Sequence, residues 1–539
     1  MMFLGRRTMN LFILGSAVVI ILCVFLNKFS MRFGIPMLLA FIILGMLFGK
    51  DGILKIELDN YSFVADICSV ALIFIMFYGG FGTNYSTAKP IMIRAGLLAT
   101  IGVAMTAFLV GIFCHLVLKM NIIHSLLMGA VISSTDAASV FSIFRSRKLG
   151  LRYNTASLLE VESGSNDPTS YMLTIVLIQI LEGNMSTSFV ISTILLQISV
   201  GAVLGLIIGF SGTYMLNKIK FETEGFNIIF VFAIALASYS LPAIFRGNGY
   251  LSAYIAGLIM GNSKIQFKKN LVIFFDGITG LMQMLIFFLL GLLATPSRFA
   301  NIALEAISIM LVLTFIVRPL VVFLILKLFK CSMRQILLVS FAGLRGAASI
   351  VFAILVMTGG SESYKIFDIV FFIVLMSILF QGSLLPYVSK KLDMIDVEED
   401  IMKTFSDYSD ELPIQFIQIT LPENHYWVGK AIKDIQLPPE TLIVYKDDGD
   451  NIYVPDGNTV LKSGDKLVLS ALDVEDIRGI KLTEINISAK HDYVGKKISD
   501  IARENINLII LIKRQSEVII PKGDTMILNG DLLICNQLL

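Results

Sequence analysis

The sequence predicts a polytopic α-helical membrane protein that is followed by a tandem α+β domain. The 539 residues are 56% hydrophobic and only 16% charged, and the mean hydropathy is +0.80. A soluble chain would carry charge on about a quarter of its residues. Apolar runs of bilayer length fill the first 391 residues, and short apolar runs between Gly and Pro turns fill the remainder. The formal net charge of +2 gives no reason to expect a nucleic-acid partner.

The predicted membrane unit covers residues 1–391 and contains about thirteen spans, because its apolar runs match the thickness of the hydrocarbon core. The ninth run is short, which makes it a candidate for a broken helix. The spans are placed near residues 9–27, 34–49, 62–80, 91–118, 123–144, 156–181, 188–216, 226–245, 249–262, 270–294, 300–328, 335–357 and 366–389.

Basic residues in the loops predict how the chain crosses the membrane. The loops on one side hold about eighteen Lys and Arg residues, and those on the other side hold about eight. The richer side is predicted to be cytoplasmic, which places the C-terminal domain in the cytoplasm and the N-terminus outside the cell membrane. Arg6 and Arg7 oppose this orientation locally. No small-residue cleavage site follows the first apolar run, so we expect it to be retained as a helix.

A polar stretch interrupts the sixth apolar run, and the functional prediction rests on it. Residues 159–168 read LEVESGSNDP and place Glu162, Asn166 and Asp167 at membrane depth. Ionisable groups there are costly and usually mark an ion pathway or a proton relay. The fifth run is interrupted in the same way by Ser133-Ser134-Thr135-Asp136. Two neighbouring helices that each carry a carboxylate and small hydroxyl residues suit a small desolvated cation.

The chemistry of such a site centres on Asp167. Burial favours the neutral form of a carboxyl group, so this side chain can alternate between a proton and a cation. The hydroxyl or carbonyl of Thr135 and the hydroxyl of Ser163 can complete a coordination shell, and Asp136 can adjust the local charge. Because residue 166 is Asn rather than a second Asp, one carboxylate carries either one proton or one monovalent cation. This arrangement predicts electroneutral one-for-one exchange.

Glu162 needs a counter-charge, because an unpaired buried carboxylate is expensive. Arg318 and Arg345 lie well inside late spans, and we expect Arg318 to pair with Glu162 and Arg345 to support the helix crossing. The alternative is that all these side chains are polar contacts between helices. That alternative is the stronger one for the Glu162–arginine pair, since a permanent ion pair transports nothing. The functional interpretation is the stronger one for Asp167.

A short internal repeat favours a transporter architecture. Residues 135–141 (TDAASVF) resemble residues 345–352 (RGAASIVF), which lie seven spans later. An odd offset gives the two elements opposite orientations in the membrane. Inverted repeats with discontinuous crossing helices and a midplane site are typical of secondary transporters.

The same residues carry a family resemblance. The Glu162-Ser163-x-x-Asn166-Asp167 pattern, the Thr135-Asp136 pair and the GLRGAAS segment resemble the NhaP-like, sodium/proton exchanger branch of the cation/proton antiporters over roughly residues 10–390. The resemblance implies a thirteen-helix fold, a homodimer and an elevator-like moving core. It assigns ion and proton binding to Asp167, the lining of the site to Asp136, Thr135 and Ser163, and supporting roles to Asn166, Glu162, Arg318 and Arg345. Ala137 departs from the proline that many prokaryotic relatives have after Thr-Asp.

After residue 391 the composition changes. An acidic linker at 392–411 precedes two copies of one pattern, at 412–474 and 475–539. HYWVGKAIKDI at 425–435 matches HDYVGKKISDI at 491–501, and Pro-x-Gly and Gly-Asp turns recur at the same offset of 66 residues. Short Val, Ile and Leu runs between such turns predict β-rich α+β modules. The repeated His425 and His491 are assigned no role.

These modules resemble TrkA-C, the C-terminal (RCK) regulatory domain of potassium-conductance regulators, present here twice. No GxGxxG motif accompanies them, so nicotinamide sensing is not expected. By analogy such modules pair across a dimer and bind a small effector. A nucleotide such as cyclic di-AMP fits the analogy, although no residue selects it. The sequence has no nucleophile–base set, metal-ligand spacing or P-loop, so neither a cofactor nor enzymatic activity is expected.

The sequence therefore predicts a secondary active transporter that exchanges monovalent cations for protons. Its expected partners are potassium or sodium ions, protons, the lipid bilayer and a second copy of the chain. The potassium-type tail favours potassium efflux coupled to proton uptake, with sodium/proton antiport as the alternative. A tail-gated cation channel is the alternative from another class. It is disfavoured because no TVGYG-like filter occurs and because a titratable carboxylate suits alternating access.

Overall fold

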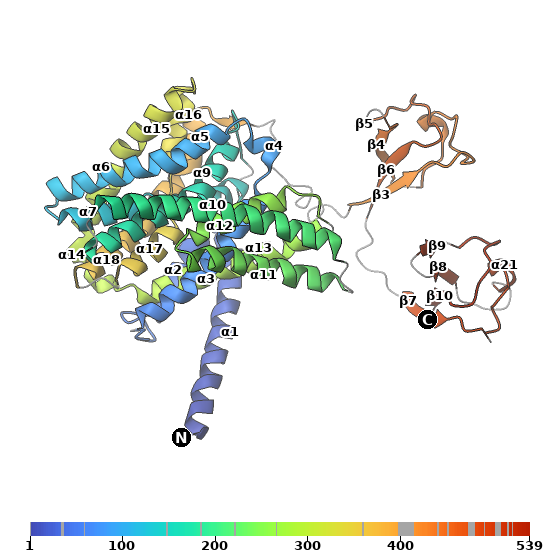
Figure 1. The fold of residues 1–539 in the computed structure, drawn as a ribbon, viewed down its shortest axis with the longest axis horizontal. Coiled ribbons are helices and arrows are strands. Elements are labelled where there is room, and N and C mark those ends of the chain that lie inside the picture. Colours follow the sequence, from blue (N-terminus) through green and yellow to red (C-terminus); the bar gives the residue numbers. More distant parts are fainter. Residues whose placement is uncertain are drawn as a thin grey trace. The chain divides into compact units, whose positions relative to one another are not determined.

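The computed structural model divides the chain into two compact units, Met1–Met402 and Lys403–Leu539. The first is almost entirely helical and the second is built from strands (Figure 1). The structure describes residues 2–33, 37–58, 60–146, 149–183, 186–219, 223–265, 267–357, 361–396, 414–438, 441–449, 452–472, 480–489, 491–501, 508–514, 517–519 and 521–538.

The helices of the first unit follow the apolar runs of the sequence. In order, its elements are α1 (Met2–Phe33), α2 (Met37–Phe48), α3 (Tyr61–Gly82), α4 (Tyr85–Ala88), α5 (Met92–Leu97), η1 (Leu98–Gly102), α6 (Val103–Leu116), α7 (Ile122–Val131), α8 (Ala137–Ser146), β1 (Gly150–Leu151), α9 (Thr155–Leu181), α10 (Thr187–Lys218), α11 (Glu224–Ile244), α12 (Gly249–Gly261), α13 (Lys268–Leu293), η2 (Pro296–Arg298), α14 (Phe299–Val312), η3 (Leu313–Val317), α15 (Arg318–Lys327), α16 (Met333–Phe341), α17 (Ala347–Met357), α18 (Ser361–Met376), η4 (Ser377–Gly382), α19 (Ser383–Lys391) and β2 (Ile395–Asp396).

Seven helical segments in the described part of the chain are long and apolar enough to cross a membrane, by length and composition. The helix α9 is not among them, because the polar stretch in its first half lowers its hydropathy. The seven are Tyr61–Gly82, Met92–Leu116, Thr187–Lys218, Gly225–Ile244, Lys268–Leu293, Pro296–Lys327 and Lys365–Lys391, and shorter apolar helices are Ile13–Leu26, Met37–Phe48, Ile122–Val131, Gly249–Gly261 and Ala347–Met357.

In the part of the chain that the structure describes, two helices are interrupted by an unwound segment between their halves, and they are the two that carry the internal repeat. The α7–α8 pair is unwound at residues 132–136 and the α16–α17 pair at residues 342–346. The first break forms without a proline, since Ala137 simply begins α8. The short ninth run, which was a candidate for a broken helix, is instead the unbroken helix α12. The side chain of Asn248 caps its start by accepting from the Leu251 N–H at 3.0 Å.

Three of the helical segments contain a π-helical turn: η1, η3 and η4. At η3 the cause is Pro319, the second residue after this turn, which has no N–H to donate. A wider turn accommodates the missing bond. Such turns are frequent at functional sites.

Two glycines of α12 show how closely the helices around the site are packed. A Cβ at Gly257 would lie 2.1 Å from the Phe77 carbonyl oxygen of α3, and one at Gly261 would lie 2.0 Å from that of Phe81. Such distances exclude any side chain. The backbones of α3 and α12 therefore touch, which leaves little freedom for one helix to move without the other.

A short antiparallel pair joins the last described residues of the first unit to the segment between α8 and α9. Strand β2 pairs with β1, with Gly150 opposite Asp396 and Leu151 opposite Ile395. The Arg152 N–H also donates to the Met394 carbonyl at 3.0 Å, and Met394 is fully buried. The β1–β2 pair thus ties the exit of α19 to the entry of α9.

The second unit contains two modules of identical topology. The first sheet has the order β3-β6-β4-β5 and the second the order β7-β10-β8-β9, all antiparallel, and each module has its own apolar core. The strands and helices are β3 (Ile414–Thr420), η5 (Ile432–Asp434), β4 (Leu442–Asp447), β5 (Ile452–Tyr453), β6 (Lys466–Leu472), β7 (Ile480–Asn486), α21 (Ile498–Ile501), β8 (Leu508–Arg514), β9 (Glu517–Ile519) and β10 (Leu532–Leu538).

The repeated histidines and Gly-Asp turns have structural roles. Nδ1 of His425 accepts the Trp427 N–H at 3.2 Å, and Nδ1 of His491 accepts the Tyr493 N–H at 3.3 Å, so each histidine closes its own turn. The aspartates of the two Gly-Asp turns are buried and each meets a cation from a neighbouring strand: Lys446 pairs with Asp465, and Arg514 with Asp531. Asp465 and Asp531 occupy equivalent positions of the 66-residue repeat, whereas Lys446 and Arg514 do not.

Replacing Asp531 with Asn is expected to destabilise the second module by about 1–3 kcal/mol, because a charge-assisted contact is lost and Arg514 loses its carboxylate partner. Asp531 accepts from Nε and Nη2 of Arg514 and from the Leu528 N–H, each at 2.8 Å. The measurement is hydrogen exchange of residues 508–538 in the full chain. Asp524→Asn is the matched control, since this exposed position already holds an asparagine, Asn458, in the first module.

The contact between Arg514 and Asp531 also makes the stability of the second module depend on pH in the acid range. Hydrogen bonds from Arg514 lower the pKa of Asp531 below its usual value. A group whose pKa is depressed on folding contributes stability above its unfolded value of about 3.9, and this contribution is lost as the pH falls through the folded pKa. Protection of β10 should therefore decrease below about pH 4, and an Asp531→Asn protein should not show this step.

Candidate functional site: two helix breaks facing a polar helix

The unwound segments of the two discontinuous helices lie against each other. The Asp136 N–H donates to the Leu344 carbonyl at 2.8 Å. Nη1 of Arg345 donates to the carbonyls of Ser133 at 2.9 Å and Ser134 at 2.7 Å. Breaking a helix leaves carbonyls without partners and a partial negative charge at its C-terminal end. The buried guanidinium of Arg345 donates to these carbonyls and places a positive charge at the end of α7.

Asp136 lies at the crossing, but its carboxylate is directed to α8. It accepts the Ser139 N–H at 3.3 Å and the Ser139 hydroxyl at 2.5 Å, which is the pattern of an N-cap. A Cβ at Gly346 would come within 2.3 Å of Asp136 Oδ2, so only glycine fits there. The expected place of Asp136 in the lining of the ion site stays a prediction beside this capping contact.

A third segment, the π turn η4, contacts the second break. The hydroxyl of Ser377, in η4, accepts the Arg345 N–H at 3.2 Å and donates to the Gln381 side chain at 3.0 Å. The amide of Gln381 donates in turn to the Phe341 carbonyl at 2.5 Å, where α16 ends. The π turn thus brings two polar side chains to the groups that the break in α16 leaves open. Neither Ser377 nor Gln381 was predicted from the sequence.

The polar face of α9 contacts the first break through three residues, Ser163, Asn166 and Asp167. The Ser163 hydroxyl donates to the Thr135 carbonyl at 2.8 Å, and the Asn166 amide donates to the Thr135 hydroxyl at 2.5 Å. The Ser134 hydroxyl donates to Oδ1 of Asp167. Asp167 is 6% exposed and Asn166 is fully buried. The structure therefore brings Thr135, Ser163, Asn166 and Asp167 together and adds Ser134, which the sequence analysis left without a role.

Glu162 forms a buried ion pair with Arg318. The two side chains are 1% and 3% exposed. Arg318 lies across Gly343, where a Cβ would be 2.9 Å from its Nε. Among the described residues, Oε2 of Glu162 and Nε of Arg318 have no hydrogen-bonding partner. The pair crosses from α9 to α15 beside the second break, and the partner of Glu162 is Arg318 rather than Arg345.

Pro168, the residue after Asp167, accepts a hydrogen bond from the residue that caps α12. The Asn248 amide donates to the Pro168 carbonyl at 2.7 Å while its oxygen caps α12. Asn248 is 2% exposed. It looks like an ordinary helix cap in the sequence, which is why its contact with α9 was not foreseen.

The oxygen atoms near Asp167 determine which ions the site can bind. The buried carboxylate of Asp167 accepts from the Ser134 hydroxyl and lies beside the Ser163, Asn166 and Thr135 contacts, whose hydroxyl, amide and carbonyl oxygens are ligands that hard cations prefer. A charge of minus one can be balanced by one proton or by one monovalent cation. The permanent ion pair and the Arg345 contacts hold the surrounding backbone in place.

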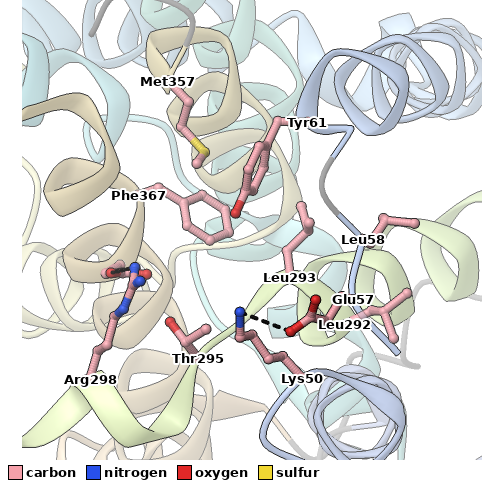
Figure 2. A pocket seen from close by; sticks show the side chains of 11 residues that line it. Lys50, Glu57, Leu58, Tyr61, Leu292, Leu293, Thr295, Arg298, Met357 and Phe367 are labelled. Carbon is pink, nitrogen blue, oxygen red and sulfur yellow. Dashed lines mark ion pairs between the residues drawn. The ribbon is translucent and has the colours of Figure 1, made fainter. Parts of the chain in front are cut away.

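A separate cavity of about 60 Å³ lies at the ends of α2, α13 and α17. Figure 2 shows its lining, with an ion pair between Lys50 and Glu57 at 3.0 Å. Arg298 and Asp368, whose charged atoms are 3.9 Å apart, are also in the wall. None of the predicted site residues is in this lining. The cavity is therefore not the space around Asp167.

Two discontinuous helices that cross at unwound segments, with a buried carboxylate on a third helix beside them, define a secondary transporter of the antiporter class. The comparisons with known proteins agree. The model of the transmembrane sodium/hydrogen exchanger family matches residues 17–391, and that of the TrkA-C domain matches residues 416–473 and 482–534. The chain belongs to the sodium/hydrogen exchanger family and carries two TrkA-C domains, which confirms the family resemblance.

Several curated proteins are similar over most of the chain. The K(+)/H(+) antiporter NhaP of Alkalimonas amylolytica is 34% identical over 481 residues, which are 87% of this chain and 83% of the relative. The K(+)/H(+) antiporter NhaP2 of Shewanella sp. (strain MR-4) is 33% identical over 467 residues, or 85% and 81%. The sodium proton antiporter MjNhaP1 of Methanocaldococcus jannaschii shares the fold, with a TM-score of 0.62, 23% identity, and coverage of 70% of this chain and 97% of that structure.

Proposed function

We propose that this protein exchanges potassium ions for protons, one for one and without net charge movement, and that Asp167 carries each in turn. The observation that carries the proposal is the buried carboxylate of Asp167, which accepts from Ser134 and lies beside the Ser163, Asn166 and Thr135 contacts at the helix crossing. Asn166 at the neighbouring position adds no second titrating group. Potassium is favoured because the similar relatives NhaP and NhaP2 are named K(+)/H(+) antiporters.

Sodium/proton exchange is the second candidate. The low-affinity Na(+)/H(+) antiporter NhaS1 of Synechocystis sp. is 27% identical over 386 residues, or 67% of this chain. The same ligands can hold sodium, because the selectivity of an oxygen cage depends on its size and flexibility. The lower identity and shorter overlap make this the weaker alternative.

The proposal extends to the organisation of the protein. The membrane unit would have thirteen spans in a homodimer of the cell membrane, with the N-terminus outside and the TrkA-C domains in the cytoplasm. The distribution of loop charges supports this orientation of the chain. The tail would regulate exchange by binding a small effector, for which a nucleotide such as cyclic di-AMP is the candidate by analogy.

The test is cation-driven proton movement in proteoliposomes, with potassium and sodium in turn, with and without a clamped membrane voltage. Exchange that ignores the voltage and prefers potassium supports the proposal. A preference for sodium would keep the mechanism and change the substrate. A cation current without proton movement would place the protein among channels instead.

A further inference from the structure

We propose that Ser134 sets how tightly Asp167 holds its proton, and that its hydroxyl oxygen is one of the ligands of the transported cation. This proposal rests on the proposed role of Asp167. Ser134 lies in the break between α7 and α8, and its hydroxyl donates to Oδ1 of Asp167. Its backbone carbonyl accepts from Arg345 at 2.7 Å. Ser134 is therefore held by its backbone at the crossing while its side chain faces the carboxylate.

The chemistry of a hydroxyl explains the first part of the proposal. A serine hydroxyl has one proton to donate and two lone pairs with which to accept. Donation to an ionised carboxylate is a charge-assisted contact and stabilises the charged form. When Asp167 takes up a proton, this contact loses its charge assistance and becomes weaker. Ser134 therefore favours release of the proton and, with it, capture of a cation.

The same geometry explains the second part. While the hydroxyl proton points to Asp167, the oxygen lone pairs remain free to face a cation that the carboxylate attracts. Ser134 and Asp167 come from different helices, so a cation between them would join the break to α9. Ser134 is 2% exposed, and its hydroxyl is a preformed oxygen ligand that bulk water does not replace.

The neighbouring hydroxyls provide a control within the same segment. The Ser133 hydroxyl donates to the Ala130 carbonyl at 2.6 Å, inside the last turn of α7. The Thr135 hydroxyl accepts from Asn166 at 2.5 Å. Three consecutive hydroxyl residues thus have three different partners. Ser133 is as buried as Ser134 but is directed away from Asp167.

The experiment compares the pH profile of exchange for Ser134→Ala, Ser134→Thr and Ser133→Ala in proteoliposomes. For Ser134→Ala we expect the acid limb of the profile to move up by about one pH unit, since the proton is held more tightly. At the acid end the apparent KM for the cation should rise about tenfold, because proton and cation compete for one carboxylate. Ser134→Thr should restore the wild-type profile, and Ser133→Ala should not change it.

An unchanged profile for Ser134→Ala, or an equal shift for Ser133→Ala, would overturn the assignment. Ser134→Cys, with nearly the same volume and a weaker donor, should move the profile in the same direction by less, and it serves if the alanine variant does not fold. Asp167→Asn is measured in parallel. Exchange by that variant would reject the proposed function, whereas its loss together with an unchanged Ser134→Ala profile would reject only the role of Ser134.

A different observation carries a second proposal: we infer that the tail acts on transport through the β1–β2 pair. The chain enters the tail directly after β2, and β1 lies between α8, which begins next to Asp136, and α9, which holds Asp167. A displacement of β2 therefore reaches the helices on both sides of the site. These are the two helices whose relative position decides whether the ligands meet.

The contacts around this pair show how the displacement would be transmitted. Asp393 pairs with Arg152 at 3.2 Å and with Arg334, on α16, at 3.0 Å. The Gln335 amide donates to the Tyr153 carbonyl and the Thr155 hydroxyl, both at 3.2 Å, at the start of α9. The ion pairs are exposed and weak. The backbone pairing and the buried Met394 hold the segment more firmly.

The test is a reversible disulfide between cysteines placed at Gly150 and Asp396, which are opposite each other in the pair. The five native cysteines are all buried. Exchange is measured for the full chain and for a chain that ends at residue 402, each reduced and oxidised. Under reducing conditions we expect removal of the tail to change the rate about fivefold or more. In the oxidised protein this dependence should disappear.

Tail removal without effect in the reduced protein, or with the same effect in the oxidised protein, would overturn this second proposal. The single-cysteine variants control for oxidation elsewhere. If the disulfide does not form, Asp393→Ala combined with Met394→Ala loosens the pair instead. In that protein too, exchange should no longer depend on the presence of the tail.

Discussion

Replacing Asp167 with Asn is expected to abolish cation/proton exchange, down to the level of liposomes without protein. Asn has nearly the same shape and its amide oxygen can still accept from Ser134, so the helix crossing should remain intact. It can neither take up a proton nor carry a negative charge, and both are required of a group that binds the two ions alternately. Exchange is measured as proton movement driven by a cation gradient, with folding checked by thermal unfolding of the purified protein.

The matched control is Asp66→Asn. Asp66 is also an aspartate within a helix of bilayer length, α3, but it is exposed and lies outside the crossing. This variant should retain exchange close to that of the wild type. If Asp167→Asn exchanged at a near-normal rate, Asp167 would not be the carrier and the one-for-one mechanism would lose its basis.

Replacing Arg318 with Leu is expected to cost about 3–5 kcal/mol of stability, because it leaves Glu162 as an unpaired charge in a buried site. The fully buried pair between α9 and α15 has no access to water that could compensate for the loss. Replacing both residues, as Glu162→Leu with Arg318→Leu, should recover most of the stability, since no buried charge remains. The measurement is chemical or thermal unfolding in one detergent for all variants.

Arg298→Leu provides the comparison, since Arg298 is 61% exposed and its contact with Asp368 is 3.9 Å long. Exposed pairs of this kind contribute at most about 1 kcal/mol. An Arg318→Leu protein that is no less stable than Arg298→Leu would show that Glu162 does not depend on its partner. A double variant as unstable as the single one would show that packing, rather than charge, dominates.

Much of the architecture could be predicted because it follows from burial. Polar residues inside apolar runs must be satisfied by other segments, and this requirement predicted the first break and the pairing of Glu162 with Arg318, while the internal repeat predicted the second break. The duplication of the tail was equally accessible, because 66-residue spacing without gaps leaves the two modules the same strand order. The count of thirteen spans is still a prediction, and seven segments in the described residues meet the length and composition of a membrane span.

Other features could not be predicted, for physical reasons. In an unwound segment no period tells which of three consecutive hydroxyls faces the carboxylate, so Ser134 could not be distinguished from Ser133 and Thr135. The i, i+4 spacing of Ser377 and Gln381 was visible, but nothing in the sequence indicated that this face meets a broken helix. The lining role of Asp136 came from the family resemblance and stays a prediction. Its capping contact with Ser139 could not be predicted, because it depends on α8 beginning directly after Asp136.

The π turn η3 has a consequence for how this protein tolerates changes in length. Each residue of an α-helix rotates the next by about 100°, and a π turn inserts one residue without lengthening the regular helix by a full turn. Arg318 is the first residue after that insertion. Its direction toward Glu162 is thus set by the number of residues before it as much as by its own identity. Deletions in Leu313–Val317 would turn the guanidinium away from α9, whereas conservative substitutions there would not.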